Sequence, residues 1–195
     1  MNTSAFTRYF LAVLLALLAI APMGHAHAQA LNPPPPPDAK CSTNANGTVC
    51  HFDGTRSGTN MPNWGNVVCN GFTINFTFSA ATHSDQTYDA SGNVTMEVRH
   101  VVFTGTLANS TDPAKIVPYD GNFLRTMNYK ANNTLSFSGL MARVGSPDAP
   151  VAKNVGLLIL NDNLPDGQNI IFAAGHFDTQ QGLPMNTQAL CAALS

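Results

Sequence analysis

Residues 72–78 have the sequence Phe-Thr-Ile-Asn-Phe-Thr-Phe, with apolar side chains at even positions and polar ones at odd positions. Successive side chains of a β-strand point to opposite faces of the sheet, so this alternation predicts a strand with one buried face. The stretch Val94-Thr-Met-Glu-Val-Arg99 repeats the pattern, with Val94, Met96 and Val98 on one face. The two stretches predict a sheet with a core side and a solvent side.

Further apolar stretches fit the same interpretation and are separated by turn-forming Asp, Asn, Gly and Pro residues. They lie near residues 101–103, 123–129, 135–137, 155–160 and 170–172. Apolar residues nowhere follow helical spacing over three turns, and only residues 80–81 and 188–194 suit a helical turn. We therefore predict an all-β fold, an antiparallel meander of about 7–8 long strands that closes into a barrel or a flattened sandwich.

Composition limits the classes of function. Only 10% of the 195 residues are charged and the formal net charge is -2, which argues against a nucleic-acid partner and against a polybasic membrane-binding patch. Hydrophobic residues make up 44% of the chain, so charge-driven disorder is excluded. One folded domain is the expectation for this length.

The beginning of the chain has the features of a secretory signal. Arg8 precedes an apolar run from Phe10 to Ala21, which is shorter than the about 20 residues that a membrane-spanning helix needs. Small residues at Ala26-His-Ala28 suit signal peptidase. We predict a signal peptide over residues 1–28, with Ala30 as an alternate cleavage site, no membrane span after cleavage, and a secreted or periplasmic location.

Five consecutive prolines occupy positions 33–37. Such a run favours a stiff, extended polyproline II conformation. We predict a proline-rich spacer over residues 29–40 and a secreted β domain over residues 41–195. The alternative, a docking ligand for a proline-recognising partner, would favour flanking basic or aromatic residues, and Asn32 and Asp38 are neither.

Four cysteines follow the predicted signal, at Cys41, Cys50, Cys69 and Cys191. An even number of cysteines in an oxidising compartment predicts two disulfides. Their spacing lacks the close pairs of a zinc site, so we expect no metal. We also expect no cofactor. Three connectivities are possible. We favour Cys41–Cys50 because Asn46-Gly47 between them predicts a tight turn, which leaves Cys69–Cys191.

Several short motifs resemble a group of small secreted bacterial all-β proteins. They are Val68-Cys-Asn-Gly-Phe-Thr-Ile-Asn-Phe-Thr77, Gly92-Asn-Val94, Thr104-Gly-Thr-Leu-Ala-Asn-Ser110 and the terminal Cys191-Ala-Ala-Leu194. The resemblance spans roughly residues 66–195 and implies an exported β-rich domain without an implied activity. One early and one terminal cysteine of that group resemble Cys69 and Cys191, which supports their pairing; Cys41 and Cys50 lie outside the shared pattern.

A few residues are candidates for a ligand site. Arg125 shares a face with Phe123 and Met127, and a buried guanidinium needs a carboxylate or an anionic ligand. The only Glu of the chain, Glu97, alternates onto the face opposite Val98. The alternative to a buried Arg125 is that its face points outward and its guanidinium is solvated. The candidate ligand-lining residues are His100, Phe123, Arg125, Met127 and Phe137.

Catalytic motifs are missing from the sequence: it contains no Gly-x-Ser-x-Gly elbow, phosphate-binding loop or His-Glu-x-x-His. His176-Phe-Asp178 provides two groups at metal-ligand spacing, but two ligands do not make a site. We predict a soluble exported binding or interaction module rather than an enzyme, with a small apolar ligand or a surface protein as partner. The alternatives are a small outer-membrane β-barrel and a secreted enzyme that uses His100 or His176 as its base.

Overall fold

The structure, a computed structural model, describes residues 30–63, 67–146, 148, 150–165, 168–177 and 187–195. The predicted signal peptide lies outside these residues. The strands are β1 (Lys40–Asn44), β2 (Gly47–Met61), β3 (Val68–Cys69), β4 (Phe72–Asp89), β5 (Val94–Asn109), β6 (Ile116–Asn128), β7 (Thr134–Gly145), β8 (Pro150–Asn161) and β9 (Ile170–Phe177). They are followed by the helix α2 (Thr187–Ala193).

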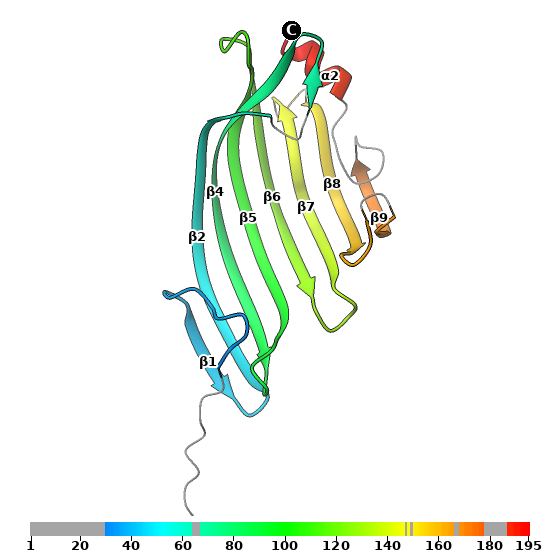
Figure 1. Cartoon of the computed structure of the whole chain (residues 1–195). Helices are drawn as coiled ribbons and strands as arrows, with labels where there is room; N and C mark the ends of the chain where they lie inside the picture. Colours follow the sequence, from blue (N-terminus) through cyan, green and yellow to red (C-terminus); the bar gives the residue numbers. More distant parts are fainter. Residues whose placement is uncertain (1–29, 64–66, 147, 149, 166–167, 178–186) are drawn as a thin grey trace, which may run out of the picture.

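All strands belong to one antiparallel sheet with the order β1-β2-β4-β5-β6-β7-β8-β9, and β3 pairs with β4. Apart from β3, which pairs only with β4, each strand lies next to the strand that follows it in the chain, as Figure 1 shows. The prediction of an all-β antiparallel meander is thus confirmed. Strands β4 to β8 are 12 to 18 residues long, whereas strands in globular proteins usually have about 5–6 residues.

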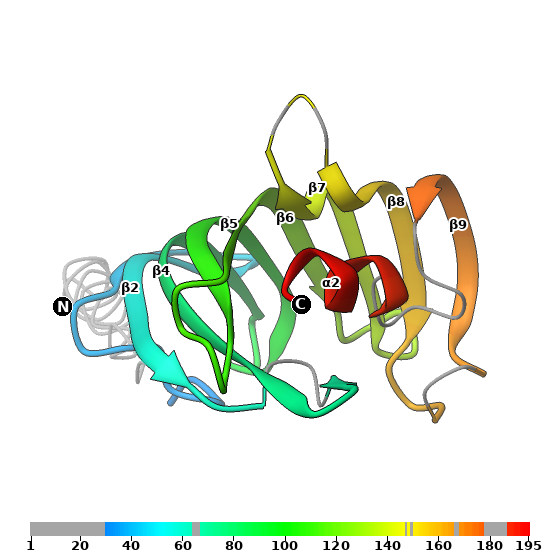
Figure 2. The same cartoon turned by 90° about the horizontal axis from the view of Figure 1, so that it is seen from above.

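Of the two predicted forms, barrel or flattened sandwich, the closed barrel is wrong. Within the described residues, β9 pairs only with β8 and β1 pairs only with β2, so the sheet stays open. Seen from above, the sheet is curved, with α2 against its concave side (Figure 2). A helix that buries apolar side chains on this side removes part of the driving force for the two edges to meet.

Alternation assigns each strand residue to one of two faces. We call the face that α2 covers the concave face; it comprises the even-numbered residues of β4, the odd-numbered residues of β5 from Glu97 onward and the odd-numbered residues of β6. The other face is the convex face. The main core cluster lies on the concave face beside α2 and consists of Val67, Cys69, Ile74, Leu107, Val117, Val144, Ala152, Leu190 and Leu194.

A disulfide joins α2 to the sheet at this end. Cys69 in β3 is bonded to Cys191 in α2. The side-chain amide of Asn109, buried at the end of β5, donates a hydrogen bond to the backbone carbonyl of Leu194 at 2.9 Å. Both contacts hold the C-terminus on the concave face, and the helical turn expected around residues 188–194 is confirmed.

The opposite end of the sheet is contacted by the segment before β1. Asn32 forms a parallel bridge with Asn93, and the phenol of Tyr88 lies 2.9 Å from the backbone oxygen of Pro33. A second disulfide, Cys41–Cys50, links β1 to β2. Both favoured cysteine pairings are therefore present. The predicted proline-rich spacer is attached to the sheet at Asn32 and Pro33.

Candidate functional site

Aromatic side chains line a hollow on the concave face between its two covered ends. The hollow has a volume of about 220 Å³, and we call it the aromatic hollow; its lining residues are Phe76, Phe78, Ala80, Phe103 and Tyr119. The rings of Phe76 and Phe78 stack at 5.6 Å between centroids, and those of Phe103 and Tyr119 lie 4.6 Å apart. The hollow therefore offers nearly continuous apolar surface.

Glycine opposite an aromatic residue explains how the rings fit together. Gly121 of β6 is the cross-strand partner of Phe103. A Cβ atom on Gly121 would lie 2.3 Å from the Phe103 ring, so the absence of a side chain lets that ring lie over the neighbouring strand. The aromatic row continues across the sheet, because the ring of Phe103 is 6.4 Å from that of Phe123, which is 5.9 Å from that of Phe137.

A charged cluster lies further along the same face, toward the N-terminal segment. Glu97 is 7% exposed, and its Oε1 atom accepts from Arg125 Nη1 at 2.6 Å and pairs with Arg99 Nη2 at 3.2 Å. Its Oε2 atom accepts from the Gln86 amide at 3.0 Å. We call Glu97, Arg99 and Arg125 the arginine cluster. It contains two guanidiniums and one carboxylate.

Tyr88 connects this cluster to the N-terminal segment. Its hydroxyl lies 2.8 Å from Gln86 Oε1 and 2.9 Å from the Pro33 carbonyl oxygen, so its one hydrogen is shared between two acceptors. Burial raises the pKa of the Tyr88 phenol above its usual value of 10.0, and the charge of Glu97 raises this pKa further. Tyr88 therefore remains a neutral hydrogen-bond donor at physiological pH.

Two polar atoms next to the arginine cluster have no partner. In the described part of the chain, Ser84 Oγ and Arg99 Nε are the buried side-chain atoms that make no hydrogen bond. Ser84 and Arg99 are direct cross-strand partners on β4 and β5, so both atoms belong to the same part of the concave face. Buried polar groups without a partner are uncommon in native proteins.

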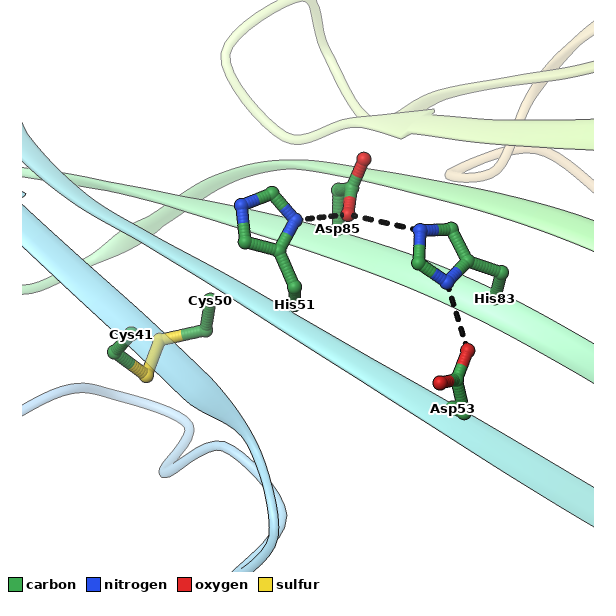
Figure 3. Close-up of polar contacts among 6 residues, drawn as sticks. All are labelled: Cys41, Cys50, His51, Asp53, His83 and Asp85. Atoms are coloured by element: carbon green, nitrogen blue, oxygen red, sulfur yellow. Dashed lines mark hydrogen bonds and ion pairs between the residues drawn. A yellow bond between two sulfur atoms is a disulfide. The ribbon is translucent and has the colours of Figure 1, made fainter.

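The convex face of the same strands has a second charged group, drawn in Figure 3. His51 Nδ1 lies 2.5 Å from Asp85 Oδ1, and His83 Nδ1 lies 2.7 Å from Asp53 Oδ1. His83 Nε2 is 3.8 Å from the same Asp85 oxygen. These four residues, which we call the histidine cluster, join β2 and β4 and are exposed to solvent over 40% or more of each side chain.

The histidine cluster has the character of an exposed ion-pair chain. The hydrogen bond from His83 to Asp53 raises the pKa of His83 above its usual value of 6.5, with Coulomb contributions from Asp53 and Asp85. Both histidines use Nδ1 to contact a carboxylate. Within the described residues, no three His, Cys, Asp or Glu side chains are grouped so that they could hold a metal ion.

The structure places four of the five candidate ligand-lining residues together. Phe123, Arg125, Met127 and Phe137 share the concave face, because Arg125 is opposite Phe137 in the β6–β7 register. His100 is the exception and corrects the predicted set. It pairs with Leu124, which alternates to the convex face, and its Nε2 lies 2.7 Å from Asn122 Oδ1.

The remaining sequence candidate, His176, and the histidine cluster were not brought together by the sequence patterns. His176 is an exposed residue of β9, and Asp178 lies outside the described residues. Sequence reasoning missed the histidine cluster, although both pairs have the spacing His-x-Asp, at His51-Phe-Asp53 and His83-Ser-Asp85. Neither pair lies in a stretch that the alternation predicts to be a strand, so the spacing alone did not indicate that each His and Asp share a face, as residues i and i+2 of a strand do.

Comparisons of the chain with protein-family models, curated proteins and solved structures find no match. In the part of the chain that the structure describes, no helix combines the length and apolar character needed to cross a bilayer. The two disulfides indicate an oxidising, extracytoplasmic environment. The geometry of the concave face is therefore the basis for a functional conclusion.

Proposed function

We propose that this chain is an exported, soluble binding protein, secreted or periplasmic, whose concave face binds a small apolar ligand. The observation that supports this proposal is the aromatic hollow. Concave sites lined mostly by apolar and aromatic side chains, with a few polar groups nearby, are typical places for a small molecule to bind. The disulfides agree with export of the chain to an oxidising compartment.

The size of the hollow bears on what it binds. Complete pockets for small molecules have volumes of about 300–1,000 Å³, so a hollow of about 220 Å³ accommodates an alkyl or aromatic group rather than a whole large ligand. The remainder of the ligand would lie along the open concave face.

The polar groups on the concave face favour binding over catalysis. A general base needs a reacting group within hydrogen-bond distance and a suitably tuned pKa. Glu97, the carboxylate of this face, is instead bonded to two arginines and to Gln86. This arrangement holds charge in place, as a binding site requires.

Titration with the neutral fluorescent probe N-phenyl-1-naphthylamine tests the proposal. We expect a saturable rise in fluorescence with the full-length processed protein, and affinity about tenfold lower for Phe103→Ala, because about 1.4 kcal/mol of ring contact is lost. Val102→Ala is the matched control, since Val102 is the adjacent residue on the convex face.

Phe103→Leu keeps an apolar side chain and separates loss of binding from loss of folding. We expect intermediate affinity, with circular dichroism spectra of all three variants like that of the unmodified protein. The proposal is wrong if the probe shows no saturable binding, or if Val102→Ala and Phe103→Ala weaken it equally.

A further inference from the structure

We propose that the ligand is a single-chain amphiphile with a carboxylate headgroup, bound with its headgroup at the arginine cluster and its tail in the aromatic hollow. This inference rests on the proposed function and specifies the class of ligand. Three independent features of the concave face support it: its charge, its unpartnered polar atoms and the distance between its polar and aromatic parts.

The charge of the concave face differs in sign from that of the chain. The formal net charge of the protein is -2. Among the described strand residues, however, the charged side chains on the concave face are three arginines and one glutamate: Arg56, Arg99, Arg125 and Glu97. Arg56 is the cross-strand partner of Ala80, which lines the aromatic hollow. A hydrophobic surface with excess positive charge is complementary to an anionic amphiphile.

The arginine cluster is itself incompletely neutralised. Both oxygens of Glu97 are already used, since Oε1 contacts the two guanidiniums and Oε2 accepts from Gln86. One positive charge therefore remains for a ligand. The side chains of Arg99 and Arg125 are 35% and 27% exposed, so both are partly open to solvent on the concave face. A planar guanidinium binds a carboxylate through two parallel hydrogen bonds.

Unpartnered atoms lie at the same place. Ser84 is fully buried, and neither its hydroxyl nor Arg99 Nε has a hydrogen-bond partner in the described structure. Ser84 and Arg99 are cross-strand partners, so a carboxylate bound by the Arg99 guanidinium lies beside both residues. The ligand would then supply the acceptors that these groups lack.

The distance between the arginine cluster and the aromatic hollow suits an amphiphile. Arg99 and Phe103 lie on the same face of β5, four residues apart, which corresponds to about 13 Å along a strand. Val101, between them on this face, is apolar and half-buried. A medium-length acyl chain spans this distance in extended form, so that one molecule reaches both the arginine cluster and the hollow.

Three dodecyl compounds that differ only in headgroup test the inference: laurate, dodecanol and dodecyltrimethylammonium, each below its micelle concentration. Displacement of N-phenyl-1-naphthylamine from the full-length processed protein gives their relative affinities. We expect laurate to bind at least tenfold more tightly than dodecanol, and the cationic compound to bind most weakly. Dodecyl phosphate is included to distinguish a carboxylate from a phosphate headgroup.

Arg99→Gln should remove the preference for laurate while leaving dodecanol binding within twofold. Arg99→Lys keeps the charge and should retain part of the preference, which guards against a folding defect in the glutamine variant. Arg143→Gln is the matched control, because Arg143 pairs with Asp120 on the convex face and should not affect any of the ligands.

The outcomes separate the two proposals. Equal affinity for laurate and dodecanol overturns the headgroup inference and leaves the binding function standing. Tighter binding of dodecyl phosphate than of laurate overturns the choice of carboxylate. If neither the fluorescent probe nor any dodecyl compound binds, the proposed function fails and the inference fails with it.

Discussion

Glu97 and Asp85 are carboxylates on neighbouring strands, β5 and β4, but on opposite faces of the sheet. Each contacts two basic side chains: Glu97 lies between Arg99 and Arg125, and Asp85 between His51 and His83. Their surroundings differ. The Glu97 side chain is 7% exposed and that of Asp85 is 40% exposed.

The difference shows how burial changes the consequence of one type of contact. A carboxylate removed from water depends on its partners, so loss of those contacts destabilises the fold. An exposed carboxylate is screened by water and salt, and its pairs contribute little to stability. We therefore expect the concave face to determine stability and ligand binding, and the convex face to respond to pH.

The largest effect should come from releasing α2 from the concave face. Cys69–Cys191 closes a loop with a sequence separation of 122 residues, and Cys41–Cys50 closes one of 9. In the chain-entropy model these loops correspond to about 5 and about 2.7 kcal/mol of stabilisation. Replacing both cysteines of a pair by serine should lower the free energy of unfolding in this order, as measured by urea unfolding. A larger loss for the Cys41/Cys50 variant would show that the C-terminal cover contributes less than we infer.

The second-largest effect is the difference in stability between variants of the two carboxylates. Glu97→Gln and Asp85→Asn each replace a carboxylate by its amide. We expect Glu97→Gln to lower the free energy of unfolding by about 2–3 kcal/mol, less than a fully buried pair would because both arginines are partly exposed. Asp85→Asn should cost below about 1 kcal/mol. Urea unfolding at neutral pH measures both changes.

High salt sharpens this second test. Salt screens exposed pairs more than buried ones. In about 1 M sodium chloride the cost of Asp85→Asn should shrink toward zero, while that of Glu97→Gln should persist. Equal costs for the two variants, or equal sensitivity to salt, would contradict the contrast between the faces.

Much of this arrangement follows from local sequence patterns. The alternation in residues 72–78 predicts which side of β4 is buried, and Ile74 is indeed fully buried. The Asn46-Gly47 signal predicts that the chain folds back between Cys41 and Cys50, which it does, but the turn is one residue earlier than predicted. The turn residues are Ala45 and Asn46, Asn44 pairs with Gly47, and this register places Cys41 opposite Cys50. The alternation also predicts that Arg125 shares a face with Phe123 and Met127, and it does. The predicted core side of β5 is wrong, however: Met96 is exposed on the convex face, whereas Glu97, on the face opposite Val98, is buried beside Arg125.

Other features depend on relations between strands that a single sequence does not specify. His100 follows Met96 and Val98 in alternation, but whether that face is concave or convex depends on where α2 packs. The meeting of His51 with Asp85 requires the β2–β4 register, which skips the short β3. Failure of the sheet to close depends on its curvature and on α2, and neither is visible in the periodicity of the strands.

The smallest effect is the pH response of the histidine cluster. The pKa of His83 is raised above 6.5, first by its hydrogen bond to Asp53. A raised pKa in the folded state means that the contribution of this contact to stability is fully present below the unfolded value and is lost as pH rises through the folded value. An NMR titration of the His83 ring proton should show the raised pKa, and Asp53→Asn should move this pKa back toward 6.5.

Asp120→Asn is the control variant for this titration. The Asp120 carboxylate contacts Arg143, so its replacement should leave the His83 titration unchanged. An unaltered His83 titration in Asp53→Asn would mean that the pair does not persist in solution, and the pH response assigned to the convex face would then have to come from other groups.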